Sequence, residues 1–319
     1  MRGENRGRTS LIISPIGATR GAISRVKLCA IFIGLGLTAC QPGSDSTDNS
    51  AARQHVDAMS GEHVGDHGSP SAAAGIEPER SIVAETLPYA EVEDELVYGH
   101  FVFPSDMVDP LPALIVVHEW WGLNEGVRAM ADRLAGAGYI VLAVDLFNGK
   151  TAEFSPDARQ LMLEVVENPQ RANENIRQAF NFVKETAGAP RIGVLGWCFG
   201  GGWALNAGML LPEELDALVI YYGQVTDDRE MLAPIDAPIL GLFAGSDRGI
   251  PVSTVENFED ALRALDKNHE IIVYPDVGHA FANPSGNNYN AEVAQLAWEK
   301  TLSFLDFHLG LGTVTTPAE

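Results

Sequence analysis

The chain has 319 residues, 46% of them hydrophobic, and carries a formal net charge of −22 at pH 7. This charge argues against nucleic acid or an anionic lipid surface as a partner, because both repel an acidic protein. One large domain behind an export segment and a linker accounts for the length and composition.

The N-terminal segment is typical of a signal peptide. Residues 1–27 hold several basic side chains and one acid, Glu4, and residues 28–39 form an uncharged, mostly apolar run. That run is too short to span a bilayer. It ends in Leu37-Thr38-Ala39-Cys40, which resembles the lipobox of bacterial lipoproteins. We expect a signal peptide over residues 1–39, a lipid anchor on Cys40 and a location in the cell envelope, facing the periplasm. The alternative is an ordinary secretory signal with an incidental cysteine.

The three cysteines have different expected fates. Cys29 leaves with the signal peptide, Cys40 is acylated, and Cys198 remains as a single thiol without a disulfide partner. An unpaired thiol is a liability in an oxidising compartment, so its presence favours a chemical role.

Residues 40–80 are predicted to form a disordered tether. The segment is rich in small and polar residues and has few large apolar ones, so it buries too little surface to order itself. Its histidines and acids would bind a metal ion only weakly, because nothing fixes their geometry, and a solvated linker is the expected interpretation. These residues are His55, Asp57, Glu62, His63, Asp66 and His67.

The catalytic domain is expected over residues 81–312, followed by a short tail over 313–319. Apolar runs that read as strands alternate with segments of helical spacing, which predicts an α/β fold with a mainly parallel sheet and helices on both faces. Strands are expected at 96–103, 113–118, 139–145, 191–195, 217–222, 238–244 and 270–274. Helices are expected at 125–137, from Ser155 as a capping residue, and at 173–186, 252–265 and 290–309.

The sequence Gly196-Trp197-Cys198-Phe199-Gly200 stands between an apolar strand and a helix that is small and apolar. This is the pattern of a nucleophile elbow, where a sharp strand-to-helix turn presents the nucleophile above the sheet. The N-terminus of the following helix favours a thiolate and offers N–H groups to an oxyanion. The alternative is a structural, buried cysteine.

Two partners for this nucleophile follow in the chain. Asp247 comes just after one apolar strand and His279 just after the next. The order of nucleophile, acid and histidine is that of the α/β-hydrolases, in which the histidine moves the proton and the acid orients its ring.

A fourth element is His118-Glu119-Trp120-Trp121-Gly122, at the end of a central apolar strand. Its position is that of an oxyanion loop, so the backbone N–H groups of Trp120 and Phe199 are the expected oxyanion donors. Glu119 is expected either to accept a hydrogen bond from the Cys198 thiol or to pair with an arginine at the rim.

With these motifs the chain resembles the dienelactone hydrolase family over roughly residues 85–310. The resemblance implies an α/β-hydrolase fold, a triad of Cys198, Asp247 and His279, and no metal or organic cofactor. It also implies that Glu119 holds the resting thiol and changes partner when substrate binds.

One departure concerns substrate binding. The dienelactone-opening enzyme has an arginine shortly after its histidine segment, and this chain has Asn283 there. Arg159 is a candidate for a second carboxylate-binding arginine. Arg248 could compensate, although a solvated charge is the simpler interpretation. Loss of a bidentate arginine argues against dienelactone itself as substrate.

The aromatic side chains expected around the pocket indicate an apolar or aromatic substrate, although about half of them are expected to belong to the core. They are Trp120, Trp121, Trp197 and Phe281.

Together these patterns predict a lipid-anchored cysteine hydrolase that cleaves carboxylic ester or lactone bonds of small molecules through an acyl-thioester. A non-catalytic envelope binding protein with the same fold is one alternative. A thiol redox sensor is another, although the mature chain offers Cys198 no resolving cysteine.

Overall fold

The structure is a computed structural model that describes residues 48–70 and 75–310. The expected signal peptide, the acylated Cys40 and the tail lie outside these residues and stay predictions. Within the described ranges, no helix has both the length and the apolar character needed to cross a membrane.

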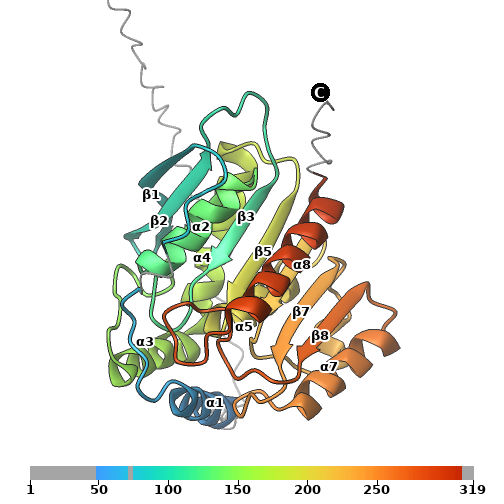
Figure 1. The fold of residues 1–319 in the computed structure, drawn as a ribbon. Coiled ribbons are helices and arrows are strands. Elements are labelled where there is room, and N and C mark those ends of the chain that lie inside the picture. Colours follow the sequence, from blue (N-terminus) through green and yellow to red (C-terminus); the bar gives the residue numbers. More distant parts are fainter. Residues whose placement is uncertain (1–47, 71–74, 311–319) are drawn as a thin grey trace, which may run out of the picture. The chain divides into compact units, whose positions relative to one another are not determined.

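Eight strands form one sheet in the order β1-β2-β4-β3-β5-β6-β7-β8 (Figure 1). β1 and β2 are an antiparallel hairpin, β2 is antiparallel to β4, and the remaining neighbours are parallel. The central parallel strands are buried along their whole length, which explains why they are continuous apolar runs in the sequence. The strands are Ile82–Val92 (β1), Glu95–Pro104 (β2), Ala113–Val117 (β3), Ile140–Val144 (β4), Ile192–Trp197 (β5), Ala217–Tyr221 (β6), Ile239–Ala244 (β7) and His269–Tyr274 (β8).

Helices cover both faces of the sheet, α2 and α8 on one face and α4 and α5 on the other (Figure 1). This confirms the predicted mainly parallel sheet with helices on both sides. The helices of this domain are Glu125–Gly136 (α2), Ser155–Glu167 (α3), Pro169–Asn181 (α4), Phe199–Leu210 (α5), Arg229–Leu232 (α6), Val252–Ala264 (α7) and Ala291–Leu309 (α8). A π-helical turn at Phe182–Thr186 continues α4 to the end of the predicted helix.

The start of α3 differs from expectation in one respect. Ser155 begins the helix, as predicted, but its side chain makes no capping hydrogen bond. The Ser155 hydroxyl instead donates to the carbonyl oxygen of His63, 2.9 Å away. A tertiary contact with a distant segment has therefore replaced the local cap.

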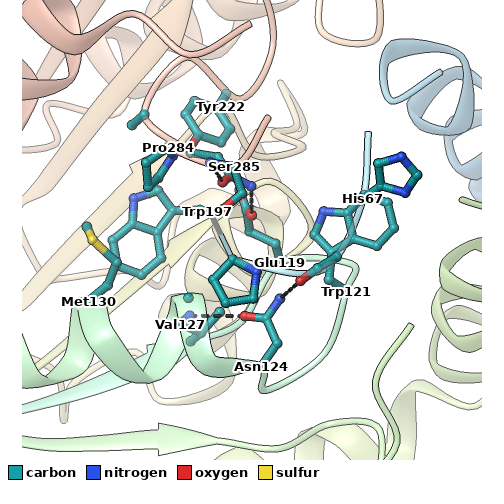
Figure 2. A pocket seen from close by; sticks show the side chains of 15 residues that line it. His67, Glu119, Trp121, Asn124, Val127, Met130, Trp197, Tyr222, Pro284 and Ser285 are labelled. Carbon is teal, nitrogen blue, oxygen red and sulfur yellow. Dashed lines mark hydrogen bonds between the residues drawn. The ribbon is translucent and has the colours of Figure 1, made fainter. Parts of the chain in front are cut away.

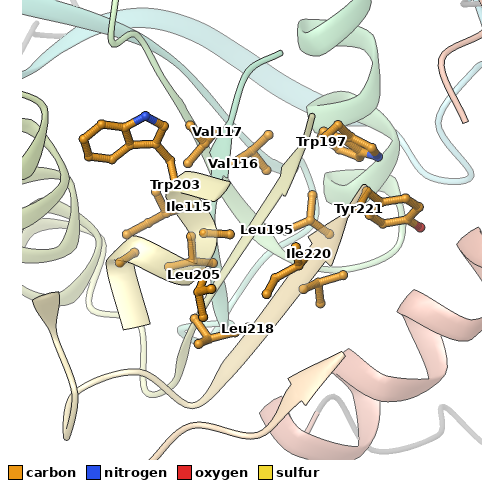
Figure 3. Packing of buried hydrophobic residues seen from close by; sticks show 14 of the residues in the cluster. Ile115, Val116, Val117, Leu195, Trp197, Trp203, Leu205, Leu218, Ile220 and Tyr221 are labelled. Atoms are coloured by element: carbon orange, nitrogen blue, oxygen red, sulfur yellow. The ribbon is translucent and has the colours of Figure 1, made fainter. Parts of the chain in front are cut away.

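The core behind the site packs side chains of β3, β5 and β6 against α5 (Figure 3). Leu195 and Ile220 of the sheet are fully buried there, as is Val117. The close approach of α5 requires glycine at position 200, where an added Cβ would lie 2.2 Å from the carbonyl oxygen of Val117. The first turn of α5 therefore lies directly on the ends of the central strands, and this contact fixes the elbow before it.

The predicted tether differs most from the structure. Asp48–Glu62 form a helix, α1, which packs against α3 (Figure 1). Its Val56 and Met59 are buried, and so are His63 and Asp66 beyond its end. Composition suggested disorder because the segment has few apolar residues. It is ordered here because the domain supplies the surface on which those few residues are buried.

Candidate active site

Cys198 occupies the turn between β5 and α5. Its φ of 56° and ψ of −120° are unusual for a residue with a side chain. The turn is held by the Cys198 N–H, which donates to the carbonyl oxygen of Tyr221 at 3.0 Å, and by the Gly201 N–H, which donates to the carbonyl oxygen of Cys198 at 3.0 Å. This strained geometry is that of a nucleophile elbow and directs the sulfur toward the carboxyl edge of the sheet.

Asp247 and His279 meet at the same edge, where β7 and β8 end. The His279 Nδ1–H donates to Asp247 Oδ2 over 2.7 Å, and both side chains are buried. Asp247 Oδ1 accepts from the N–H groups of Gly249 and Ile250, each at 2.9 Å, which fixes the carboxylate. With the proton on Nδ1, His279 Nε2 carries a lone pair, and this atom has no hydrogen-bond partner among the described residues.

The sulfur of Cys198 lies within 4.8 Å of a ring nitrogen of His279. Burial raises the pKa of the thiol well above its usual value, and the nearby Glu119 raises it further. The backbone N–H groups of Phe199 and Trp120 act in the opposite direction by hydrogen bonding to the sulfur. The two expected oxyanion donors therefore both face the nucleophile, and the resting sulfur is a protonated thiol.

Glu119 is buried beside the thiol. Burial raises its pKa to about 8, helped by the charge of Asp66 and opposed by a hydrogen bond from Asn283. The Asn283 amide donates to Glu119 Oε2 at 2.5 Å, and Glu119 Oε1 has no partner in the described part of the chain. With a pKa of about 8, Glu119 is a neutral acid at neutral pH. The hydrogen bond from Asn283 therefore joins two uncharged side chains.

A side chain that hydrogen-bonds to the thiol is His63, which was expected to belong to the tether. His63 Nε2 lies 3.8 Å from Cys198 Sγ, while His63 Nδ1–H donates to Asp66 Oδ2 over 2.9 Å. The His63 ring stacks on Trp120 at 4.6 Å between centroids and lies edge-on to His279 at 5.2 Å. Burial lowers the pKa of His63, and Asp66 partly offsets this effect. The ring is therefore neutral, and its Nε2 accepts a hydrogen bond from the protonated thiol.

One signal in the sequence could have found His63. Val56, Met59 and His63 follow one another at intervals of three and four, the spacing of a single helix face. The pattern is short, and polar and small residues surround it. The composition of the whole segment therefore favoured a disordered tether over a helix.

A pocket opens beside Glu119, and Cys198 and His279 are not among the residues that line it (Figure 2). Trp121, Trp197 and Tyr222 line it with Glu119 and Asn283, and His67 and Gly68 close one side. Trp120 is fully buried under His63, and Phe281 is fully buried against Tyr222 and Tyr274. Two of the four expected aromatic pocket residues thus belong to the core. Tyr222, which the sequence analysis did not select, takes part in the pocket wall.

Neither arginine considered for substrate binding reaches this pocket. Arg159 donates to Asp57 of α1 at 2.5 and 2.8 Å. The side chain of Arg248 is 89% exposed and lies 3.9 Å from Glu62. In the described part of the chain the pocket lining contains no arginine or lysine.

His63, Cys198 and His279 place three metal-binding atoms within 4.8 Å of one another. A thiolate and two imidazoles are ligands that Zn²⁺ accepts. An ion bound there would occupy the sulfur, so metal binding and nucleophilic attack at Cys198 exclude each other.

Comparisons with known proteins identify the family of the chain. The dienelactone hydrolase family matches residues 98–309. A protein of Escherichia coli named "Putative carboxymethylenebutenolidase" is 32% identical over 252 residues, which cover 74% of this chain and 92% of the relative. A protein of Methylorubrum extorquens with the same name is 32% identical over 226 residues, covering 66% and 76%.

The crystal structure of a protein from Klebsiella pneumoniae, described as "Putative Dienelactone Hydrolase", superposes with a TM-score of 0.64 at 27% identity. It covers 70% of this chain and 98% of its own. This similarity confirms the predicted α/β-hydrolase fold. The residues that match the family include Cys198, Asp247 and His279. The chain belongs to the dienelactone hydrolase family.

Proposed function

We propose that this protein, a hydrolase of the dienelactone hydrolase family, cleaves carboxylic ester or lactone bonds with Cys198 as its nucleophile. The observation that carries the proposal is the buried Asp247–His279 pair beside a sulfur held on a strained elbow. A ring nitrogen of His279 lies within 4.8 Å of that sulfur, and Nε2 has no hydrogen-bond partner among the described residues. An acid, an imidazole and a nucleophile in this relation support acyl transfer.

The first half of the reaction forms a thioester. His279 Nε2 accepts the thiol proton, and the sulfur attacks the carbonyl carbon of the substrate. The N–H groups of Trp120 and Phe199 stabilise the negative charge that develops on the carbonyl oxygen. His279 then returns the proton to the leaving oxygen as the carbon–oxygen bond breaks, which releases an alcohol or, from a lactone, a tethered hydroxyl.

The second half returns the free thiol. A water molecule gives a proton to His279 and attacks the thioester carbon, and the carbon–sulfur bond then breaks. The sulfur regains its proton from the imidazolium, and a carboxylic acid is released. Asp247 stabilises the positive imidazole in both halves and keeps the proton on Nδ1.

The pocket supports a preference for uncharged, apolar or aromatic substrates. Trp121, Trp197 and Tyr222 supply aromatic surface, while Glu119 and Asn283 supply neutral hydrogen-bonding groups. A substrate carboxylate would find no cation in this lining. Neutral aryl esters and lactones are therefore expected to be better substrates than carboxylated lactones.

The test is hydrolysis of a neutral short-chain p-nitrophenyl ester by the wild type, Cys198→Ala and His279→Ala. Both variants are expected to lose activity by about 10³-fold or more while keeping the circular dichroism of the wild type. Rapid quenching of the wild type should yield Cys198 carrying the acyl group, detected by mass spectrometry. Full activity in Cys198→Ala, or an acyl group only on another residue, would refute the cysteine mechanism.

A further inference from the structure

Residues 48–70 precede the segment that matches the family, residues 98–309, yet they contribute directly to the surroundings of the active site. α1 lies at the carboxyl edge of the sheet next to α3 (Figure 1). The chain after α1 places the His63 side chain against the Cys198 sulfur. This segment, residues 48–70, is called the cap from here on.

The part of the cap nearest the sulfur is held by specific backbone contacts. Asp66 Oδ1 accepts from the N–H of Asn287 at 2.9 Å. The Gly68 N–H donates to the carbonyl oxygen of Glu153 at 3.0 Å, and the Asn124 amide donates to the carbonyl oxygen of Gly68 at 2.7 Å. These bonds come from three separate loops of the domain, so they fix the position of His63 and not only that of α1.

The helical part of the cap is held more weakly. Asp57 pairs with Arg159 and Arg53 with Glu167, and these side chains are all at least one-third exposed. Exposed ion pairs contribute little to stability. Among the α1 side chains that the structure describes, the buried apolar ones are Val56 and Met59. Burial of these few apolar side chains must offset the conformational entropy lost when the whole cap is ordered. Docking of the cap is therefore expected to be reversible.

The docked cap blocks chemistry at the sulfur. Cys198 is 1% exposed and His279 is 0% exposed. A reacting carbonyl carbon must come within about 3–3.5 Å of the sulfur and place its oxygen near the oxyanion donors. The His63 ring lies against the sulfur and stacks on the ring of Trp120. The backbone N–H of Trp120 is one of the expected oxyanion donors.

We propose that the cap is an autoinhibitory element: docked, it closes the active site with His63 on the Cys198 thiol, and it must leave before substrate binds. The inference rests on the proposed role of Cys198 as nucleophile. While docked, the Asp66–His63 pair accepts the thiol hydrogen and shields the sulfur from oxidants. Undocking exposes the sulfur and frees the space beside His279 and the oxyanion donors.

Gly68 offers a way to undock the cap without changing the catalytic residues. A Cβ at this position would lie 1.9 Å from the carbonyl oxygen of Ala152 and 3.0 Å from the Trp121 ring. Because the closer neighbour is backbone, the docked position cannot accept even alanine without a shift. Gly61, in the last turn of α1, is the matched control, since a Cβ there meets nothing within 4 Å.

The experiment measures the alkylation rate of Cys198 by iodoacetamide in full-length wild type, Gly68→Ala and Gly61→Ala. The Cys198 peptide is followed by mass spectrometry. Alkylation through a rapid opening reports the open population. Gly68→Ala is expected to react roughly tenfold to a hundredfold faster, the range that overpacking a tight contact gives. Gly61→Ala should match the wild type, and unchanged alkylation in a folded Gly68→Ala would overturn the proposal.

His63→Ala provides an independent arm if Gly68→Ala fails to fold, as judged by near-ultraviolet circular dichroism. Removing the ring uncovers the sulfur while α1 keeps its own anchors, so faster alkylation is expected and an unchanged rate counts against the cap. Hydrolysis of a p-nitrophenyl ester is measured in parallel. If the variants are alkylated faster but neither they nor the wild type hydrolyse the ester, the proposed hydrolase function is refuted, whereas the proposal that the cap covers Cys198 stands. Turnover with unchanged alkylation in both variants would refute the cap alone.

Discussion

Replacing Glu119 with glutamine is expected to change how the stability of the protein depends on pH. In the folded protein burial raises the pKa of Glu119 to about 8, compared with its ordinary value of 4.5. Between these two values the unfolded chain releases the proton and the folded chain keeps it. The free energy of unfolding of the wild type therefore falls as pH rises between these values. Above about pH 8 the stability that protonated Glu119 contributes at low pH is lost completely. Glutamine has no proton to lose, so Glu119→Gln lacks this dependence.

The size of the effect follows from the interval between the two pKa values. At ~1.4 kcal/mol per pH unit, the wild type loses at most about 5 kcal/mol relative to the variant between pH 4.5 and 8. A few kcal/mol is the expected result, because relaxation and water entry reduce the penalty of burying the charge. The amide oxygen of glutamine can still accept the hydrogen bond that Asn283 donates to Glu119.

The assay is urea unfolding of both proteins at several pH values from 4.5 to 9, followed by circular dichroism. The difference between the two free energies is compared at each pH, so that titrations common to both proteins cancel. Glu256→Gln in α7 is the control for the substitution itself, because this side chain is exposed. A Glu119→Gln difference that does not change with pH would refute the argument that a buried neutral acid lies beside the thiol.

Two further substitutions test the elbow and the acid. In Gly200→Ala the added Cβ would lie 2.2 Å from the backbone oxygen of Val117, so a loss of about 3 kcal/mol or more in urea unfolding is expected. Gly202→Ala, whose Cβ would meet the Gln224 side chain at 3.3 Å, should change stability little, and equal losses would contradict the packing argument. In Asp247→Asn the amide keeps the loop bonds but offers an N–H to His279 Nδ1. We expect about 10³- to 10⁴-fold lower kcat with native stability, and near-normal turnover would rule out Asp247 as the orienting acid.

The sheet and the elbow were predictable because their signals are local. A strand buried on both faces is a continuous apolar run, and a nucleophile turn needs glycine on either side. The order of Cys198, Asp247 and His279 then placed three side chains at one edge, since parallel strands end on the same side of the sheet.

The cap could not be predicted in the same way. Its order comes from contacts with residues far away in the chain, such as the hydrogen bonds from Ser155 to His63 and from Arg159 to Asp57. A segment of low apolar content has no local signal for such contacts. The same limit applies to Glu119, for which the thiol or a rim arginine was the expected partner. The structure instead gives it a hydrogen bond from Asn283, 164 positions away.

The acids around the sulfur also bear on how a catalytic cycle ends. Hydrolysis produces a carboxylic acid that ionises in water, and the side chains near Cys198 include Asp66, Asp247 and Glu119 but no arginine or lysine from the pocket lining in the described chain. With the cap undocked and Glu119 neutral, an anionic product held there meets the carboxylate of Asp247 and no arginine or lysine of the described pocket lining, so departure of the product is favoured electrostatically. We therefore expect weak product inhibition, because position 283 carries the amide of Asn283 and not a cation.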